Sequence, residues 1–162
     1  MTSHTQNVTV FTGDLVNSTQ LTKAQISAAF DALSKCAEDA AEWHLAPLQF
    51  TRHRGDGWQV ILAQPKFALR TALYFRASLK ALGAEFDTYI GMATGKTNAA
   101  QNTDLNLRNE GVFVLSGWAL DSIKNATNYP LRMVKNNEGG PESATVILAD
   151  YIVNSWTQAQ AE

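Results

Sequence analysis

The sequence predicts a single α+β domain over residues 1–162, in which the order β-α-β-β-α-β is followed by a small C-terminal α/β extension. Short runs of β-branched and aromatic residues alternate with longer segments whose apolar residues recur every three to four positions, as expected for strands that alternate with amphipathic helices. Glycine or proline stands at most of the junctions. No repeat, low-complexity block or linker divides the 162 residues, a length that can bury one core.

The first half of the chain contains the clearest strand and helix signals. Val8–Phe11 is β-branched and aromatic and stops at Gly13-Asp14, which is typical of a strand that enters a turn. The elements expected here, in chain order, are a strand at 8–11, a helix capped by Ser18 or Thr19 that runs to about Trp43, and two strands at 48–53 and 58–62 that form a hairpin around Arg54-Gly-Asp-Gly57.

The second half begins with Pro65, which suits the first turn of a helix, and Gly83 is expected to end that helix. The remaining expected elements are a strand at 86–92, a polar loop or flap at 95–110, a strand-like run at 111–115 that leads into a helix to about 125, a strand at 131–135 and a helix at 144–156. The first six elements have the split βαβ order of ferredoxin-like domains, so both of their helices are expected on one face of an antiparallel sheet.

Composition excludes several classes of function. Thirteen basic and fifteen acidic residues give a net charge of −2, so we expect no direct binding of nucleic acid by this domain. The N-terminus has no apolar signal region, and no apolar run is long enough to span a membrane. One cysteine, Cys36, excludes an internal disulfide framework. We therefore expect a cytoplasmic domain.

Asp14 and Asp56 are the candidate metal ligands. Asp14 follows the first strand and Asp56 lies in the turn between the second and third strands, and we expect the first two strands to be neighbours, so the two carboxylates meet at one sheet edge. Two carboxylates and a backbone carbonyl suit Mg²⁺ or Mn²⁺ when phosphates complete the shell. The amides of residues 15–19 open a helix and are expected to bind phosphate. Each Asp taken alone also fits a solvated turn residue or a helix cap.

Two segments resemble the metal motifs of class III adenylyl and guanylyl cyclases. Phe11-Thr-Gly-Asp-Leu-Val-Asn-Ser-Thr19 is similar to the first motif, and Phe50-Thr-Arg-His-Arg-Gly-Asp-Gly-Trp58 is similar to the second. Tyr89–Gly95 and Gly111–Leu120 are similar to a later strand and to the strand and helix that complete the partner's half of the site. The Gly-Asp motifs, together with Ser116-Gly-Trp-Ala-Leu-Asp121, also resemble bacterial SatD-like relatives.

The resemblance implies a ferredoxin-like palm core and a head-to-tail homodimer with two active sites at its interface. It implies two Mg²⁺ or Mn²⁺ ions per site, held by Asp14, Asp56 and the carbonyl of Leu15. It implies that the turn formed by Asn17, Ser18 and Thr19 binds the phosphates of a nucleoside triphosphate. The implied reaction joins the ribose 3′-oxygen to the α-phosphorus and releases pyrophosphate.

Four positions depart from the family pattern. The base-selecting position four residues before Asp56 is Arg52, and the other base-reading position is Val114, so a pyrimidine base is favoured over adenine. The transition-state asparagine and arginine, counted from Gly117, fall on Asp121 and Asn125. We therefore expect the charge on the leaving pyrophosphate to be met by a basic residue elsewhere in the chain. The candidates are Lys124, Arg132 and Lys135.

These observations leave three hypotheses for function. The first is an active nucleotidyl cyclase that makes a 3′,5′-cyclic nucleotide. The second is a catalytically degraded cyclase-like domain that binds a nucleotide and has a regulatory role, which the missing arginine favours. The third is a palm-type polymerase or oligonucleotide synthase, against which the Gly55-Asp-Gly57 turn counts because a Gly-Gly-Asp-Asp turn is expected there.

Overall fold

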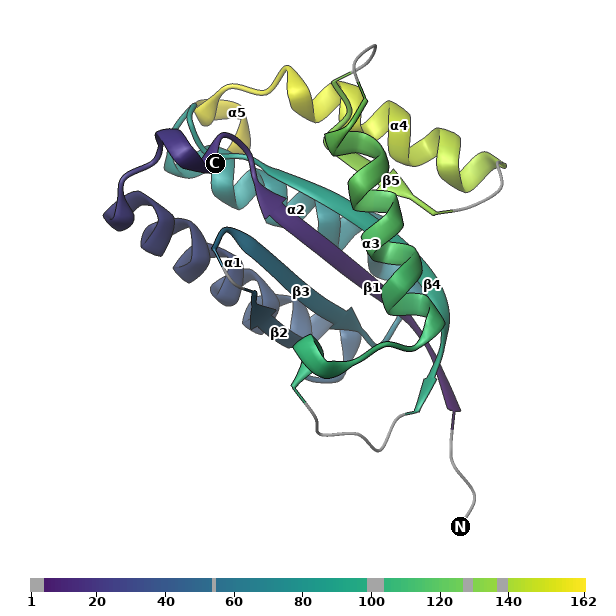
Figure 1. The fold of residues 1–162 in the computed structure, drawn as a ribbon. Coiled ribbons are helices and arrows are strands. Elements are labelled where there is room, and N and C mark those ends of the chain that lie inside the picture. The colour runs from purple at the N-terminus through teal and green to yellow at the C-terminus, as the bar shows by residue number, and fades with distance from the viewer. Residues whose placement is uncertain (1–4, 54, 99–103, 127–129, 137–139) are drawn as a thin grey trace.

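The computed structural model describes residues 5–53, 55–98, 104–126, 130–136 and 140–162. A five-stranded sheet in the order β2-β3-β1-β4-β5 forms the centre of the molecule (Figure 1). Its strands are β1 (Thr5–Leu15), β2 (Gln49–Arg52), β3 (Gly57–Leu62), β4 (Thr88–Asn98) and β5 (Met133–Lys135). The helices are α1 (Lys23–His44), α2 (Ala68–Leu82), α3 (Gly111–Lys124), α4 (Pro141–Asn154) and α5 (Gln158–Ala161), with 3₁₀ turns η1 (Ser18–Gln20), η2 (Pro65–Phe67) and η3 (Leu105–Leu107).

The first four strands are antiparallel in the ferredoxin-like arrangement, which confirms the predicted fold class. One detail of the prediction is wrong, because β1 pairs with β3 and β4 and not with β2. Asp56 still reaches Asp14, since the turn that precedes β3 places Gly57 opposite Asp14. The α/β extension adds β5, which pairs with β4 in parallel.

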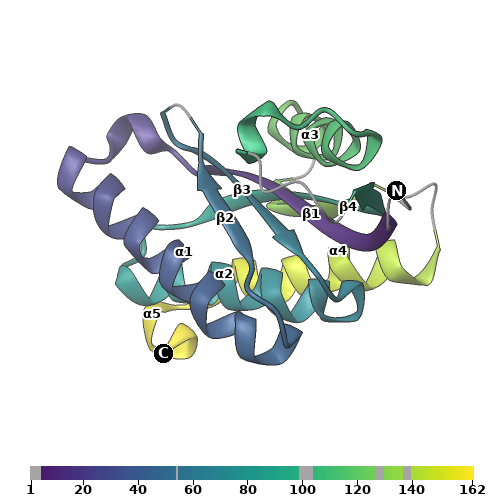
Figure 2. The same cartoon turned by 90° about the horizontal axis from the view of Figure 1, so that it is seen from below.

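Helices α1 and α2 cover one face of the sheet, as predicted, and α4 lies on the same side (Figure 2). The core between them is apolar and aromatic, with Phe11, Trp58 and Phe75 fully buried. Apolar side chains at 3.6-residue spacing mark the inner side of α1, and the buried ones include Phe30, Leu33 and Cys36. A capping box at Thr22 starts α1, so the predicted caps Ser18 and Thr19 belong instead to the turn η1.

Helix α3 covers the opposite face of the sheet (Figure 2). It begins at Gly111, so the prediction of a strand at 111–115 is wrong. The helix packs directly on β4 at Gly91, where a Cβ atom would lie 2.3 Å from the backbone nitrogen of Leu120 and 2.4 Å from the carbonyl oxygen of Ser116. A glycine is therefore required at this crossing.

Two other expectations about the second half are modified. The fourth strand continues to Asn98, into the segment expected to be a loop, and the following residues 99–103 lie outside the described part of the chain. The terminal helix spans Pro141–Asn154, close to its predicted position. None of the helices in the described ranges combines the length and the apolar character needed to cross a membrane.

Candidate active site at the end of β1

Strand β1 sends alternate side chains to the two faces of the sheet. Phe11 and Leu15 enter the core beneath α1 and α2, whereas Val8 and Val10 pack against α3. Because side chains alternate along a strand, Asp14 lies on the α3 face, where Lys124 at the end of α3 contacts it. The alternation therefore separates the carboxylate from the apolar core.

The Asp14 side chain is buried, and only one of its two carboxylate oxygens has a hydrogen-bond partner among the described residues. The residue is 8% exposed, and its Oδ2 accepts a hydrogen bond from Lys124 Nζ. Its Oδ1 is buried and has no partner among the described residues. Burial raises the pKa of Asp14, Lys124 opposes that rise, and the neighbouring Asp56 carboxylate adds to it. A buried carboxylate oxygen without a donor is an unfavourable arrangement that a bound cation would relieve.

Asp56 lies beside Asp14 and is held by the turn that follows β1. Ser18 Oγ donates to Asp56 Oδ2, and the backbone nitrogen of Leu15 donates to the carbonyl oxygen of Asp56 at 3.1 Å. Burial raises the pKa of Asp56, but the hydrogen bond from Ser18, the neighbouring Asp14 side chain and the positive charge of Lys124 together outweigh it, so the pKa lies below the ordinary value. The two carboxylates thus have opposite pKa shifts, which is typical of functional carboxylate pairs.

The backbone around Asp14 is fixed from the neighbouring strand. Thr88 Oγ1 donates to the carbonyl oxygen of Asp14 at 2.8 Å and accepts from Trp58 Nε1 at 2.9 Å. The Trp58 indole also fills the space beside Gly13, where a Cβ atom would lie 2.1 Å from it. Gly13 is therefore needed for packing against Trp58.

The donor set at this position fits a divalent cation that is completed by phosphate oxygens. Asp14 has a carboxylate oxygen without a partner among the described residues, Asp56 is ionised, and the carbonyl of Leu15 is the one that the first motif would use. No group of three or more His, Cys, Asp or Glu side chains gathers in the described ranges, so phosphate oxygens of a substrate would complete the coordination shell of a metal held here. Lys124 places a positive charge against Asp14.

The turn expected to bind phosphate is present, but only part of it is available. The amides of Leu15 and Val16 donate to the carbonyl oxygens of Asp56 and Asp87. The part of the turn that remains for phosphate binding is Asn17, Ser18 and Thr19, and Asn17 has a left-handed backbone with φ 50°. Ser18 is linked to Asp56, and Thr19 is exposed beside it. The structure therefore keeps these three residues next to the carboxylates.

The two residues predicted to select the base do not meet at this site. Arg52 pairs with Trp58 in the β2–β3 ladder, its guanidinium lies 4.0 Å from the centre of the Phe30 ring, and it donates to the carbonyl oxygen of Gly55. It therefore faces α1, on the other side of the sheet from Asp14, which does not fit the base-selecting role predicted for it. Val114 is exposed on the outer side of α3, not on a strand.

The three basic candidates differ in position. Lys124 contacts Asp14 directly, and this hydrogen bond raises the pKa of Lys124, so the side chain is protonated at neutral pH. Arg132 donates to Tyr89 Oη at 2.9 Å and stacks 4.6 Å from that ring, one strand away from Asp14. Lys135 forms an ion pair with Glu142 and is not brought to the site.

Because α3 begins at Gly111 and not at Gly117, the expected position of the transition-state arginine can also be counted from Gly111. Counted from Gly111, the glycine at which the helix begins, the positions four and eight residues later are Leu115 and Ala119. Neither side chain can donate a hydrogen bond, so the arginine is missing whether the count starts at Gly117 or at Gly111.

The sequence did not predict the role of Thr88, whose hydroxyl holds the backbone of Asp14 in place. The signal was a threonine at the start of the fourth strand, beside the strand that carries Asp14.

Comparison with known proteins identifies the fold. A bacterial light-regulated adenylyl cyclase superposes with a TM-score of 0.57 at 13% identity, covering 82% of this chain and 76% of its own. The active GGEEF domain of a diguanylate cyclase from Vibrio cholerae gives 0.60 at 14% identity, covering 83% and 85%. A guanylyl cyclase gives 0.52 at 17% identity, covering 93% and 81%.

The chain has the fold of cyclase catalytic domains. No model of a protein family matches the sequence, and no curated protein matches it. The expectation of a cyclase-type ferredoxin-like palm core is thereby confirmed.

Proposed function

We propose that the domain is a nucleotidyl cyclase that converts a nucleoside triphosphate to a 3′,5′-cyclic nucleotide and pyrophosphate, with Mg²⁺ or Mn²⁺ held by Asp14, Asp56 and the Leu15 carbonyl. The observation that carries this proposal is the buried Asp14 Oδ1, which has no partner in the described part of the chain and lies next to an ionised Asp56 at the end of β1. The cyclase fold of the structural neighbours supports it.

The chain's own residues account for binding and charge neutralisation. A bound Mg²⁺ or Mn²⁺ would act as a Lewis acid on the phosphate oxygens. Asp14 and Asp56 position the triphosphate by holding that cation, and the turn Asn17–Thr19 is next to the phosphates. Lys124 is protonated and within reach, so it can neutralise charge on the pyrophosphate after leaving Asp14. The 3′-oxygen bonds to the α-phosphorus, the bond to pyrophosphate breaks, and the hydroxyl proton passes to water.

A second candidate is a nucleotide-binding regulatory domain without turnover. The observation that favours it is the absence of an arginine on α3 under either count, with Leu115 and Ala119 in its place. The charge that an arginine supplies in phosphoryl transfer is large, and a lysine offers a single point charge without the planar fork. Both candidates use Asp14 and Asp56, and they differ in whether product forms.

A homodimer is part of the proposal. The outer side of α3 exposes Val114, Leu115 and Trp118, and Trp118 is 63% exposed. Aromatic and aliphatic side chains of this kind are enriched in the centres of protein interfaces. We expect the Trp118→Asp variant to sediment as a monomer under conditions where the unchanged chain is dimeric. We also propose that the domain works in the cytoplasm, where nucleoside triphosphates are abundant.

The test is incubation of the purified chain with each of the four NTPs and Mn²⁺, followed by mass spectrometry of the products. A cyclic mononucleotide that is absent with Asp56→Asn supports the cyclase and identifies its base. Metal-dependent binding without product supports the regulatory domain. A cyclic dinucleotide, or neither binding nor product, would contradict the proposed reaction.

A further inference from the structure

A cavity of about 510 Å³ opens directly beside the metal-binding turn. Its wall begins at Val16 and Asn17, the two residues that follow Leu15, and continues over the first turns of α1. The opposite wall is the end of α2 and the turn after it, including Lys80 and Glu85. A volume of this size lies within the range of small-molecule sites, about 300–1,000 Å³.

The side chains that line this cavity offer both donors and acceptors. Gln25 Nε2 on α1 donates to Glu85 Oε1 at 3.1 Å, so this pair bridges the space between α1 and the turn after α2. Gln20 and Lys80 add an amide and an ammonium group. A carboxylate has about four acceptor positions, so Glu85 keeps the capacity to accept further hydrogen bonds. The lining therefore suits a polar ligand with N–H groups that donate to Glu85.

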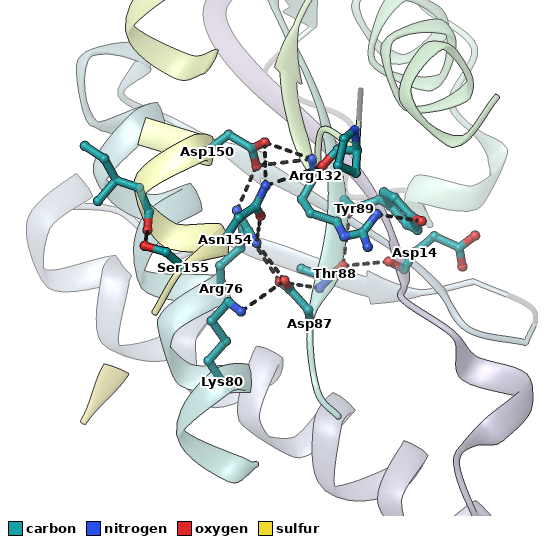
Figure 3. A network of polar contacts seen from close by, with 12 residues as sticks. Asp14, Arg76, Lys80, Asp87, Thr88, Tyr89, Arg132, Asp150, Asn154 and Ser155 are labelled. Carbon is teal, nitrogen blue, oxygen red and sulfur yellow. Dashed lines mark hydrogen bonds and ion pairs between the residues drawn. The ribbon is translucent and has the colours of Figure 1, made fainter. Parts of the chain in front are cut away.

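Arg132 connects the cavity to the carboxylate site. Its side chain lines the cavity and donates to Tyr89 Oη at 2.9 Å, and Tyr89 stands opposite Asp14 in the β1–β4 ladder. Figure 3 shows Arg132 and Tyr89 between Asp14 and the buried ion pair of Arg76 with Asp87. A ligand whose phosphates meet Asp14 can thus place its remaining part in the cavity of the same protomer.

The cavity wall that includes Asp87 is held in place by a buried ion-pair network. Arg76 is fully buried and forms ion pairs with Asp87 at 2.6 Å and Asp150 at 2.8 Å (Figure 3). The carbonyl oxygen of Asp87 accepts from the amide of Val16, where the cavity begins. A wall held by a buried ion-pair network and joined to the metal-binding turn is pre-organised, which reduces the ordering cost of binding a ligand.

We propose that this cavity binds the nucleoside part of the NTP whose phosphates bind at Asp14 and Asp56 of the same protomer, and that Glu85 accepts hydrogen bonds from an amino group of the base. The inference rests on the proposed function and goes beyond it, because the resemblance implied that the partner protomer supplies the contacts to the base. It assigns base recognition to Glu85 in place of Arg52 and Val114. Adenine, cytosine and guanine carry an amino group and uracil does not, so UTP is the weakest of the four ligands.

The first experiment fills the cavity. Ala84 lines it from an exposed turn, so Ala84→Trp blocks the space without disturbing the core. Ala46→Trp is the matched control, since Ala46 lines a separate cavity of about 250 Å³ away from the carboxylates. We expect Ala84→Trp to weaken Mn²⁺-dependent NTP binding about tenfold or more, which is about 1.4 kcal/mol, and Ala46→Trp to leave it unchanged. Binding of Mn²⁺ alone stays the same in both variants.

The second experiment tests the base contact and the number of protomers that are needed. We expect Glu85→Gln to reduce the preference for CTP over UTP. We also expect one NTP to bind per protomer with the same affinity when the chain is diluted until it sediments as a monomer.

The outcomes separate this inference from the proposed function. If the unchanged chain binds NTP but Ala84→Trp binds it equally well, or if monomers lose binding, the cavity assignment is wrong and the proposed function remains. An equal affinity for UTP and CTP in the unchanged chain overturns the role of Glu85. If no NTP binds in the presence of Mn²⁺, the proposed function and the cavity assignment both fail.

Discussion

The two faces of the sheet have different chemistry, although the same strands supply both. Toward α1 and α2, the buried residues Phe11, Trp58 and Phe75 form a continuous apolar core. Toward α3, the same strands bury Asp14 and Gln59, and one side-chain oxygen of each has no partner among the described residues. An unsatisfied buried polar group costs about 1–3 kcal/mol. The comparison indicates that one face stabilises the fold and that the other holds the candidate site at some cost in stability.

The largest expected effect comes from the apolar face. Phe75 is fully buried against the rings of Phe11, Phe50 and Trp58, so Phe75→Ala should lower the free energy of unfolding by about 3–5 kcal/mol. Urea unfolding followed by circular dichroism measures this change. If the two faces are independent, the variant that is still folded at low temperature binds Mn²⁺ with unchanged affinity. A loss of metal binding in the folded variant would contradict that separation.

A smaller loss of stability is expected where α3 crosses the sheet. Gly91→Ala places a methyl group against the backbone of α3, and overpacking of this kind costs about 1–3 kcal/mol. Because α3 carries Lys124, the displaced helix should also weaken the Lys124–Asp14 contact. Thermal unfolding and Mn²⁺ titration of the same variant measure the two effects. Gly117→Ala is the control, since a Cβ atom there meets no atom of the described residues within 4 Å.

Lys124→Gln tests the polar face at the carboxylate site itself, because Lys124 contacts Asp14. The lysine ammonium group competes with a metal ion for Asp14, so its removal should strengthen the binding of Mn²⁺ alone by about tenfold, or 1.4 kcal/mol. The same change should weaken NTP binding, because a positive charge near the phosphates is lost. Calorimetric titrations with Mn²⁺ and with Mn²⁺–NTP measure both affinities. Parallel changes in the two affinities would show that Lys124 has no separate contact with the nucleotide.

The smallest effect concerns acid stability at the far end of β4. The hydrogen bond from Arg108 lowers the pKa of Glu110 from 4.5 to about 2. A lowered carboxyl pKa stabilises the fold above pH 4.5, and this contribution is lost as the pH falls toward about 2. The Glu110 side chain is 24% exposed and screened by solvent, so the contribution is about 1 kcal/mol.

Glu110→Gln should therefore lower the free energy of unfolding at pH 7 and give a curve that is flatter between pH 5 and about 2. Urea unfolding across this pH range checks the shape of the curve. An unchanged slope would mean that the Arg108–Glu110 pair does not contribute. Metal affinity at pH 7 should not change, because the pair lies away from Asp14.

The sequence predicted the apolar face well and the polar face poorly. On α1, the 3.6-residue period of Phe30, Leu33 and Ala37 marks the side that is buried, because helical spacing and burial coincide there. The run 111–115 was misread as a strand because it is rich in β-branched and large apolar residues. Its helical nature shows only when it is joined to the residues after it, since Val112, Ser116 and Ile123 keep one buried side.

The side of the sheet that Arg52 faces was misjudged for a related reason. A base-selecting role requires Arg52 on the same face as Asp14, but it pairs with Trp58, and residues paired across strands share a face. Because Trp58 is fully buried beneath α1 and α2, its strand partner Arg52 faces that side as well. Asp14 and Asp56 were predicted together because both lie next to turns. Their contacts to Lys124 and Ser18 depend on packing that no local pattern records.

The most direct test is calorimetric titration of Mn²⁺–NTP into the unchanged chain, Asp14→Asn, Asp56→Asn and the control Asp31→Asn, which alters an exposed residue of α1. If Asp14 and Asp56 hold the metal, both site variants stay folded and lose metal-dependent NTP binding by about a hundredfold or more, or about 2.7 kcal/mol. Asp31→Asn then binds like the unchanged chain. Unchanged affinity in a folded Asp14→Asn variant would contradict the assignment of the site.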